Sequence, residues 1–128
     1  MSKKVVLVGH CGPDTSYLRM AVMSADRSIK VLAADDADEL DALVRDGVDL
    51  VLFNRELGWG FDSAAGADVI RQYRTRQPNL KMMLVSNYPE AQAAAVAAGA
   101  LPGFGKREIG TPRVPQLIRD ALTAVEAQ

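Results

Sequence analysis

Short apolar runs alternate with segments of helical period along the whole chain. The runs occupy residues 5–8, 30–34, 48–53, 80–85 and 101–105. Alternation of this kind predicts βα units built on a parallel sheet. The first run, Val-Val-Leu-Val, is apolar at every position, as a central strand covered on both faces requires. We therefore expect five βα units in a doubly wound α/β fold, forming one domain over residues 1–128.

The first two helices are predicted from their apolar stripes and end signals. Asp14 or Thr15 is expected to cap a helix after Gly12-Pro13. Its apolar stripe consists of Leu18, Ala21, Val22 and Ala25, spaced i, i+3, i+4 and i+7. Asp36 with Glu39 three residues later forms a capping-box pattern for the second helix. Gly47 marks the end of that helix.

The later segments repeat this arrangement. A Gly-, Ser- and Asp-rich loop over residues 54–66 precedes a helix expected over 67–75. Pro89 is suited to the first turn of an alanine-rich helix, and Gly99 to its end. The last helix is expected to begin near residues 112–115. Its predicted buried residues are Leu117, Ile118, Ala121, Leu122 and Val125.

Composition narrows the function classes. With 15 basic and 16 acidic residues, the chain has a net charge of −1 and no concentrated basic face. Nucleic-acid grooves and membrane-surface patches need such a face, so we expect neither partner. A single cysteine cannot form an internal disulfide, and no leader-like segment opens the sequence. These observations favour the cytoplasm.

In an open parallel sheet, ligands bind beyond the carboxyl ends of the strands. The predicted strand ends deliver a polar set that contains almost no acid: Gly9, His10 and Cys11; Asn54, Arg55 and Glu56; Ser86, Asn87 and Tyr88; and Lys106. Because His10 and Cys11 are the only histidine and cysteine, a zinc site is not expected. The set also lacks a convergent nucleophile, base and orienting acid, so no enzyme activity or cofactor is predicted.

Several of these segments together resemble a response-regulator receiver domain of the CheY-like family. Asp-Leu-Val-Leu-Phe-Asn over residues 49–54 is similar to the family's third strand, and Leu-Val-Ser over 84–86 to its fourth. Ala-Gly-Ala over residues 98–100 and Lys106 stand at the family's spacing. The resemblance implies a flavodoxin-like receiver fold with strand order 2-1-3-4-5.

The departures from the family pattern concern its chemistry. Gly9 and His10 stand where the family has a metal-binding acidic pair, and Asn54 where it has the phosphoacceptor aspartate. An amide is not a phosphoryl nucleophile, and magnesium prefers carboxylate oxygens. Arg107 replaces the family's proline, so the cis peptide of the family is not expected there. Phe104 stands one place from the aromatic switch position.

The resemblance therefore implies a degenerate receiver, or pseudo-receiver, acting in two-component signalling as a phosphorylation-independent protein-interaction module. Ser86 and Lys106 are then expected to bond to Asn54 and strand-end carbonyls. The alternative is a small-ligand, anion or redox sensor that uses His10, Cys11 and Lys106.

Partner contacts are expected at aromatic residues and at one face. The candidate contact residues are Trp59, Phe61, Tyr88 and Phe104. In receivers, the face of the fourth helix, fifth strand and fifth helix binds partners or a second copy, so an effector or a homodimer contact is expected there.

Overall fold

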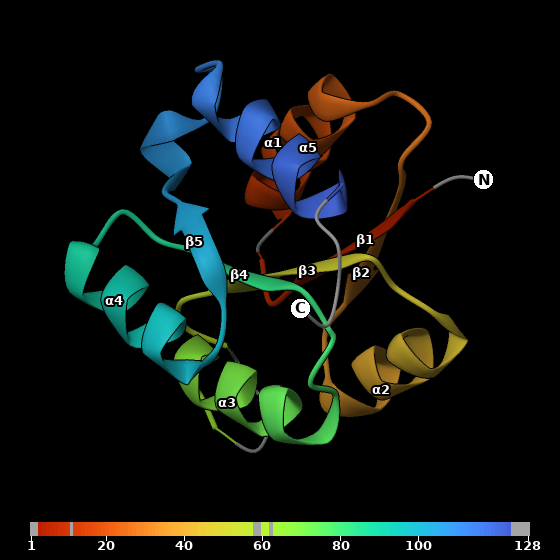
Figure 1. Cartoon of the computed structure of the whole chain (residues 1–128), viewed down its shortest axis with the longest axis vertical. Coiled ribbons are helices and arrows are strands. Elements are labelled where there is room, and N and C mark those ends of the chain that lie inside the picture. The colour runs from red at the N-terminus through yellow and green to blue at the C-terminus, as the bar shows by residue number, and fades with distance from the viewer. Residues whose placement is uncertain (1–2, 11, 58–59, 62, 124–128) are drawn as a thin grey trace.

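The computed structural model describes residues 3–10, 12–57, 60–61 and 63–123. Five parallel strands form one sheet in the order β2-β1-β3-β4-β5, which confirms the predicted topology. Figure 1 shows this sheet at the centre of the molecule. The strands are β1 (Lys4–Val8), β2 (Lys30–Ala34), β3 (Leu50–Asn54), β4 (Met82–Val85) and β5 (Leu101–Phe104).

Helices cover both faces of the sheet (Figure 1). One face carries α1 (Gly12–Ala25) and α5 (Arg113–Thr123). The other carries α2 (Ala37–Asp46), α3 (Gly66–Arg76) and α4 (Pro89–Ala98). A short 3₁₀ turn, η1 (Lys106–Glu108), connects β5 to α5.

The continuous apolar run of β1 is explained by its position between two cores. Val5 and Leu7 pack with α1 and α5, whereas Val6 and Val8 pack with α2, α3 and α4. All four side chains are at most 1% exposed. Successive side chains of a strand point to opposite faces, so a central strand needs apolar residues at every position.

The helix-end signals act largely as predicted. Asp36 caps α2, and its Oδ1 accepts a hydrogen bond from the Glu39 backbone N–H at 2.8 Å. Glu39 Oε1 accepts from the Asp35 N–H rather than from Asp36, so the reciprocal half of the capping box lies one residue upstream. Gly47 ends α2 with a φ of 106°, a value that glycine adopts without strain.

The boundaries of several elements differ from the predictions. Helix α1 begins at Gly12, so Asp14 lies inside its first turn instead of capping it. Strands β3 and β4 each begin two residues later than expected, at Leu50 and Met82. Val114, which was not predicted, belongs to the buried side of α5. Leu117 is only partly buried, and Val125 lies outside the described residues.

Among the described residues, no helix is both long enough and apolar enough to cross a membrane.

Candidate functional site

The carboxyl ends of β3, β4 and β5 enclose a hollow of about 200 Å³. Asn54 ends β3, Ser86 follows β4, and Lys106 opens η1 just after β5. The structure thus brings together these three residues, which are far apart in the sequence. The full lining is Asn54, Arg55, Glu56, Val85, Ser86, Asn87, Tyr88 and Lys106.

The Asn54 side chain is held by its own loop. Its Nδ2 donates to the Glu56 carbonyl at 2.8 Å, so the amide ties the end of β3 to the following turn. The amide nitrogen cannot attack a phosphoryl group, because its lone pair is delocalised into the carbonyl. The strand end therefore has an anchored amide where a phosphoacceptor would need a carboxylate.

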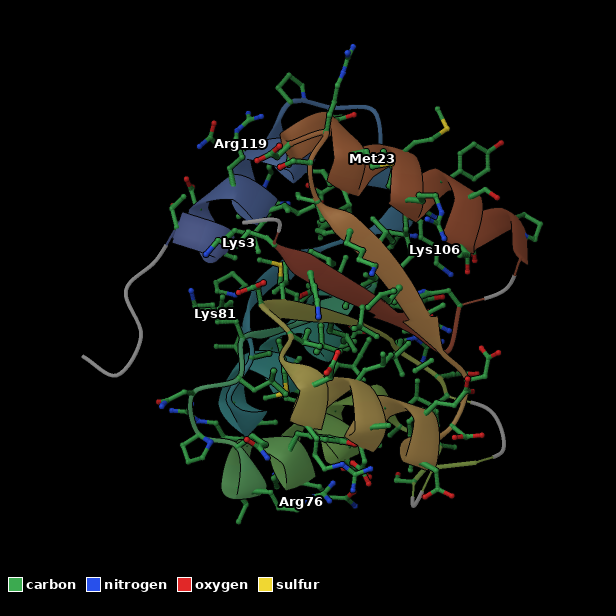
Figure 2. The ribbon with its side chains drawn as sticks, turned by 90° about the vertical axis from the view of Figure 1, so that its right-hand side faces the viewer. Lys3, Met23, Arg76, Lys81, Lys106 and Arg119 are labelled. Carbon is green, nitrogen blue, oxygen red and sulfur yellow. The ribbon has the colours of Figure 1, made fainter. Side chains whose placement is uncertain are left out.

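Lys106 forms an ion pair that the sequence analysis did not predict. Its Nζ lies 2.6 Å from Asp14 Oδ2, which projects from the first turn of α1. Figure 2 shows Lys106 at the carboxyl-end edge of the sheet, below α1. The prediction that Lys106 bonds to Asn54 and strand-end carbonyls is therefore wrong, because Asp14 is the partner of its ammonium group. An acid contributed by α1 already neutralises the ammonium.

Ser86 is also engaged locally instead of with Asn54. Its Oγ accepts from the Tyr88 N–H at 3.1 Å, and its backbone N–H donates to the Phe104 carbonyl at 2.9 Å. The side chain is only 7% exposed. Ser86 thus orders the turn between β4 and α4.

His10 fastens the end of β1 to β3. Its Nε2 donates to the Leu52 carbonyl at 3.0 Å, while Nδ1 is buried without a hydrogen-bond partner among the described residues. Burial lowers the pKa of the imidazole to about 4, because the charged form loses its hydration. The preceding residue, Gly9, has a φ of 77°, and a Cβ there would lie 2.5 Å from the Leu57 side chain. At neutral pH the two positions hold no charge.

The donor set does not fit magnesium, which the receiver resemblance would imply. Gly9 has no side chain, His10 is a neutral imidazole, and Asn54, whose Nδ2 donates to Glu56, offers only an uncharged amide oxygen. The acid in the hollow, Glu56, lies 2.9 Å from the Arg55 guanidinium. In the part of the chain that is described, no three potential ligands of a metal ion cluster together. Magnesium selects carboxylate oxygens, which are missing from these three positions.

The predicted sensor residues are His10, Cys11 and Lys106. Lys106 lines the hollow, but His10 does not. Cys11 lies outside the described residues.

The predicted aromatic contacts have different surroundings. Tyr88 is 52% exposed beside the hollow, and the Arg55 guanidinium stacks 4.8 Å from its ring centre. Phe61 packs partly buried against the α2, α3 and α4 core, and Trp59 lies outside the described residues. Phe104 is 1% exposed and packs in the opposite core, so its side chain offers little surface for the predicted contact.

Both neighbours of Phe104 are glycines that the packing requires. A Cβ on Gly103 would lie 2.2 Å from the Leu84 carbonyl oxygen. A Cβ on Gly105 would lie 2.0 Å from Asn87 Oδ1. No aromatic side chain can therefore occupy either position next to Phe104 without moving the backbone. The peptide bond from Lys106 to Arg107 is trans.

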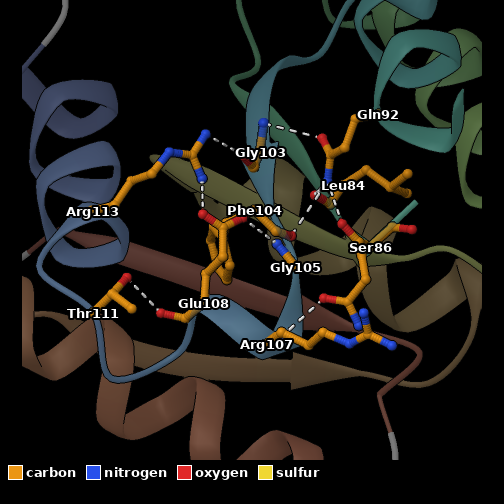
Figure 3. Close-up of polar contacts among 11 residues, drawn as sticks. Leu84, Ser86, Gln92, Gly103, Phe104, Gly105, Arg107, Glu108, Thr111 and Arg113 are labelled. Atoms are coloured by element: carbon orange, nitrogen blue, oxygen red, sulfur yellow. Dashed lines mark hydrogen bonds and ion pairs between the residues drawn. The ribbon is translucent and has the colours of Figure 1, made fainter. Parts of the chain in front are cut away.

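Gln92, which lies on α4 among alanines, was not predicted as a functional residue. Its amide contacts backbone groups of both β4 and β5 (Figure 3). A lone long polar residue on the inner side of an apolar helix was a usable signal, because a half-buried amide needs hydrogen-bond partners.

A groove of about 800 Å³ lies on the face formed by α4, β5 and the start of α5. Its α4 wall consists largely of small apolar residues, and Arg107, Glu108 and Arg113 contribute charges of both signs on the other side. Its lining includes Pro89, Gln92, Ala93, Val96, Ala97, Pro102, Arg107 and Arg113.

The chain matches known proteins by its fold and not by its sequence. No protein-family model matches the chain, and no curated protein matches its sequence. NtrX from Brucella abortus superposes with a TM-score of 0.78 at 20% identity, over 95% of this chain. The chain spans only 28% of the length of that NtrX chain.

Two further solved structures match over nearly their whole length. A response regulator from Thermotoga maritima has a TM-score of 0.77 at 17% identity, covering 97% of this chain and 100% of its own. The beryllofluoride-activated NtrC4 receiver domain dimer has a TM-score of 0.76 at 15% identity, covering 93% and 95%. Similarity at these identities concerns the fold.

Proposed function

Because the chain has the fold of response-regulator receiver domains, with Asn54 at the strand end where a phosphoacceptor would stand, we propose that it is a phosphorylation-independent protein-interaction module in two-component signalling. The observation that carries this proposal is that the polar side chains of the strand-end hollow already have partners within the protein. Its amide and its lysine are both already engaged, Asn54 with Glu56 and Lys106 with Asp14.

Phosphoryl transfer to a receiver needs a nucleophile and a metal that neutralises the transferred group. Asn54 is not a nucleophile, and Gly9 and His10 provide no carboxylate. The Lys106 ammonium lies 2.6 Å from the Asp14 carboxylate, so its charge is already balanced without a phosphate. These features support a hollow whose residues stabilise the strand ends and take no part in phosphoryl transfer. We therefore assign the domain no catalytic activity.

The residues around Phe104 also provide no route by which a chemical change in the hollow could alter the partner surface. An aromatic relay would need a side chain beside Phe104 that could alternate between buried and exposed positions. Gly103 and Gly105 cannot carry one. We therefore expect the partner surface to keep the same shape with or without a phosphoryl donor and magnesium.

The α4–β5–α5 groove is the proposed partner surface. Its α4 wall is apolar, Val96 is 45% exposed, and Arg107 stands at its rim. Exposed apolar residues flanked by charge are typical of protein contacts. An effector protein is the proposed occupant, and a second copy of the chain is the alternative; the NtrC4 receiver domain is a dimer in its activated form.

Intact mass spectrometry after incubation with acetyl phosphate and magnesium tests the chemical half of this proposal. We expect no phosphoryl adduct. The matched variant Asn54→Asp restores one carboxylate and is expected to remain without a stoichiometric adduct, because Gly9 and His10 still leave the metal unheld. Stoichiometric phosphorylation of the unaltered chain would overturn the proposal.

Affinity capture from the source cell tests the interaction half. Val96→Glu places a charge in the groove, and Met20→Glu places the same charge on α1, where Met20 is 67% exposed. Loss of a captured partner in the first variant alone supports the groove. Equal capture by both variants would locate the contact elsewhere.

A further inference from the structure

Strand β5 contains an irregularity where it pairs with β4. Met83 pairs with Leu101, but Val85 pairs with Phe104, so β5 carries one extra residue between these two pairs. A bulge of this kind interrupts the ladder and leaves backbone groups without their regular partners. Buried backbone groups need replacements for such partners.

The side chain of Gln92 supplies these replacements from α4. Its Oε1 accepts from the Gly103 N–H at 3.2 Å. Its Nε2 lies 2.9 Å from the Leu84 carbonyl oxygen, 3.1 Å from that of Ser86 and 3.3 Å from that of Phe104. A primary amide offers the same donor and acceptor types as a peptide group. Gln92 therefore acts as an added peptide unit between β4 and β5.

The backbone leaves room for this amide only because residue 103 is glycine. A Cβ there would lie 3.0 Å from Gln92 Oε1 as well as 2.2 Å from the Leu84 oxygen. Gln92 and Gly103 thus form a matched pair, in which the side chain of one fits against the bare backbone of the other.

Other side chains fix the end of β5 from its remaining sides (Figure 3). Asn87 Oδ1 accepts from the Arg107 N–H at 3.0 Å, and Glu108 Oε1 accepts from the Gly105 N–H at 3.0 Å. Arg113 on α5 pairs with Glu108 and donates to the Gly103 carbonyl at 3.4 Å. The start of α4, the end of β5 and the start of α5 are therefore joined through side chains.

From this arrangement we infer that Gln92 is a positioning residue that holds α4 on β5 in one fixed arrangement, without using the side chains of the strand-end hollow. None of its hydrogen bonds involves a side chain of Asn54, Ser86 or Lys106. The inference rests on the proposed function for its biological meaning, since it explains how the partner surface stays formed without a signal.

Amide hydrogen exchange tests this role. In Gln92→Met, a variant of similar length without hydrogen-bonding atoms, the Gly103 amide is expected to lose protection by about tenfold or more, as local opening does. Exchange at Leu52 in β3 is expected to change much less. The control is Gln116→Met, which makes the same change at an exposed position on α5 that contacts Asp120. Unchanged Gly103 exchange in Gln92→Met would overturn the inference.

A second measurement covers the case in which Gln92→Met does not fold. In the unaltered protein, the Gly103 amide is expected to exchange as slowly as amides of β1 and β3, with or without acetyl phosphate and magnesium. Fast Gly103 exchange would overturn the inference even if no phosphorylation occurs. A phosphoryl adduct with unchanged Gly103 protection would overturn the proposed function and leave the role of Gln92 standing.

Discussion

The Lys106 ammonium and the Asp14 carboxylate lie 2.6 Å apart, joining the end of β5 to the first turn of α1. Their side chains are 34% and 30% exposed, so water partly screens the attraction between the two charges. The pair lies beside the strand-end hollow, which Lys106 helps to line.

The coupling between these two residues is measurable by a double-mutant cycle. Lys106→Met, Asp14→Asn and the double variant are expected to give a coupling free energy of about 1 kcal/mol or less, because water screens a partly exposed pair. Urea unfolding at neutral pH provides the measurement. The coupling should shrink at high salt, and a coupling that is zero at low salt would show that the pair does not contribute to stability.

Magnesium is expected to leave the protein unchanged. Carboxylates about 4 Å apart repel by roughly 4 kcal/mol at an effective dielectric constant of about 20, and metal binding relieves that repulsion in an acidic pocket. Gly9, His10 and Asn54 carry no such charges at neutral pH, so there is no repulsion among them for magnesium to relieve. The melting temperature and the tryptophan fluorescence should be the same with magnesium or with EDTA. A clear magnesium-dependent shift in either quantity would contradict this expectation.

Stability should fall as the pH drops from about 6.5 to about 4 through His10. Burial lowers the pKa of His10 to about 4 in the folded protein, whereas an unfolded chain protonates near 6.5. The unfolded state therefore binds the proton first on acidification, and the free energy of unfolding decreases. Between about pH 7 and about pH 5 the loss from this group is about 2 kcal/mol.

The matched variant for that measurement is His10→Gln, which keeps an N–H donor for the Leu52 carbonyl but does not titrate. Urea unfolding of both proteins across this range separates His10 from the carboxylates. Equal pH slopes would show that the imidazole is not desolvated in the folded state.

Gly103→Ala is expected to destabilise the protein by about 2 kcal/mol or more, because overpacking forces the backbone to shift. The new Cβ would meet the Leu84 carbonyl at 2.2 Å. Gly12→Ala is the matched control, since no described atom lies within 4 Å of its Cβ position and the residue is in the first turn of α1. The control should be neutral or slightly stabilising in thermal unfolding. A Gly103→Ala protein as stable as the control would refute the close β4–β5 approach.

Asp36→Ala should cost about 1 kcal/mol through loss of the α2 cap. Asp36→Asn keeps an acceptor for the Glu39 N–H and is expected to retain most of the stability. Asp38→Ala removes an acid from the same first turn without removing the cap, so it should cost only a few tenths of a kcal/mol. Chemical denaturation distinguishes the three variants, and an equal loss in Asp36→Ala and Asp38→Ala would argue against capping.

The helices and strands are predicted well where they depend on local features of the sequence, namely the spacing of apolar residues and the residues that begin or end a helix. The apolar run of β1, the stripe of α1 and the Asp36 and Gly47 ends of α2 all depend on neighbours within a few residues. The strand order was implied by the resemblance to receiver domains. The meeting of Asn54, Ser86 and Lys106 follows because the carboxyl ends of parallel strands lie at one edge of the sheet. None of these inferences needs to know where a side chain points.

The contacts missed at the sequence level are long-range or depend on side-chain direction. Asp14 and Lys106 are 92 positions apart, and their pairing requires α1 to begin two residues earlier than its predicted cap. Phe104 was predicted at the surface, but the bulge in short β5 breaks the simple alternation of faces. Gln92 stands out as an amide among the alanines of α4, but its partners are backbone groups of β4 and β5, which the sequence does not identify.

The two glycines beside Phe104 also constrain how this sequence can change over evolutionary time. Restoring an acid at Asn54 would supply a nucleophile, but Gly9 and His10 would still leave a metal unheld. Even with those positions restored, a side chain at residue 103 or 105 collides with the backbone of β4 or with Asn87. A single substitution at Asn54, Gly9 or His10 would therefore not by itself give the chain a phosphate-responsive switch, because the glycines of β5 also leave no space for an aromatic relay beside Phe104.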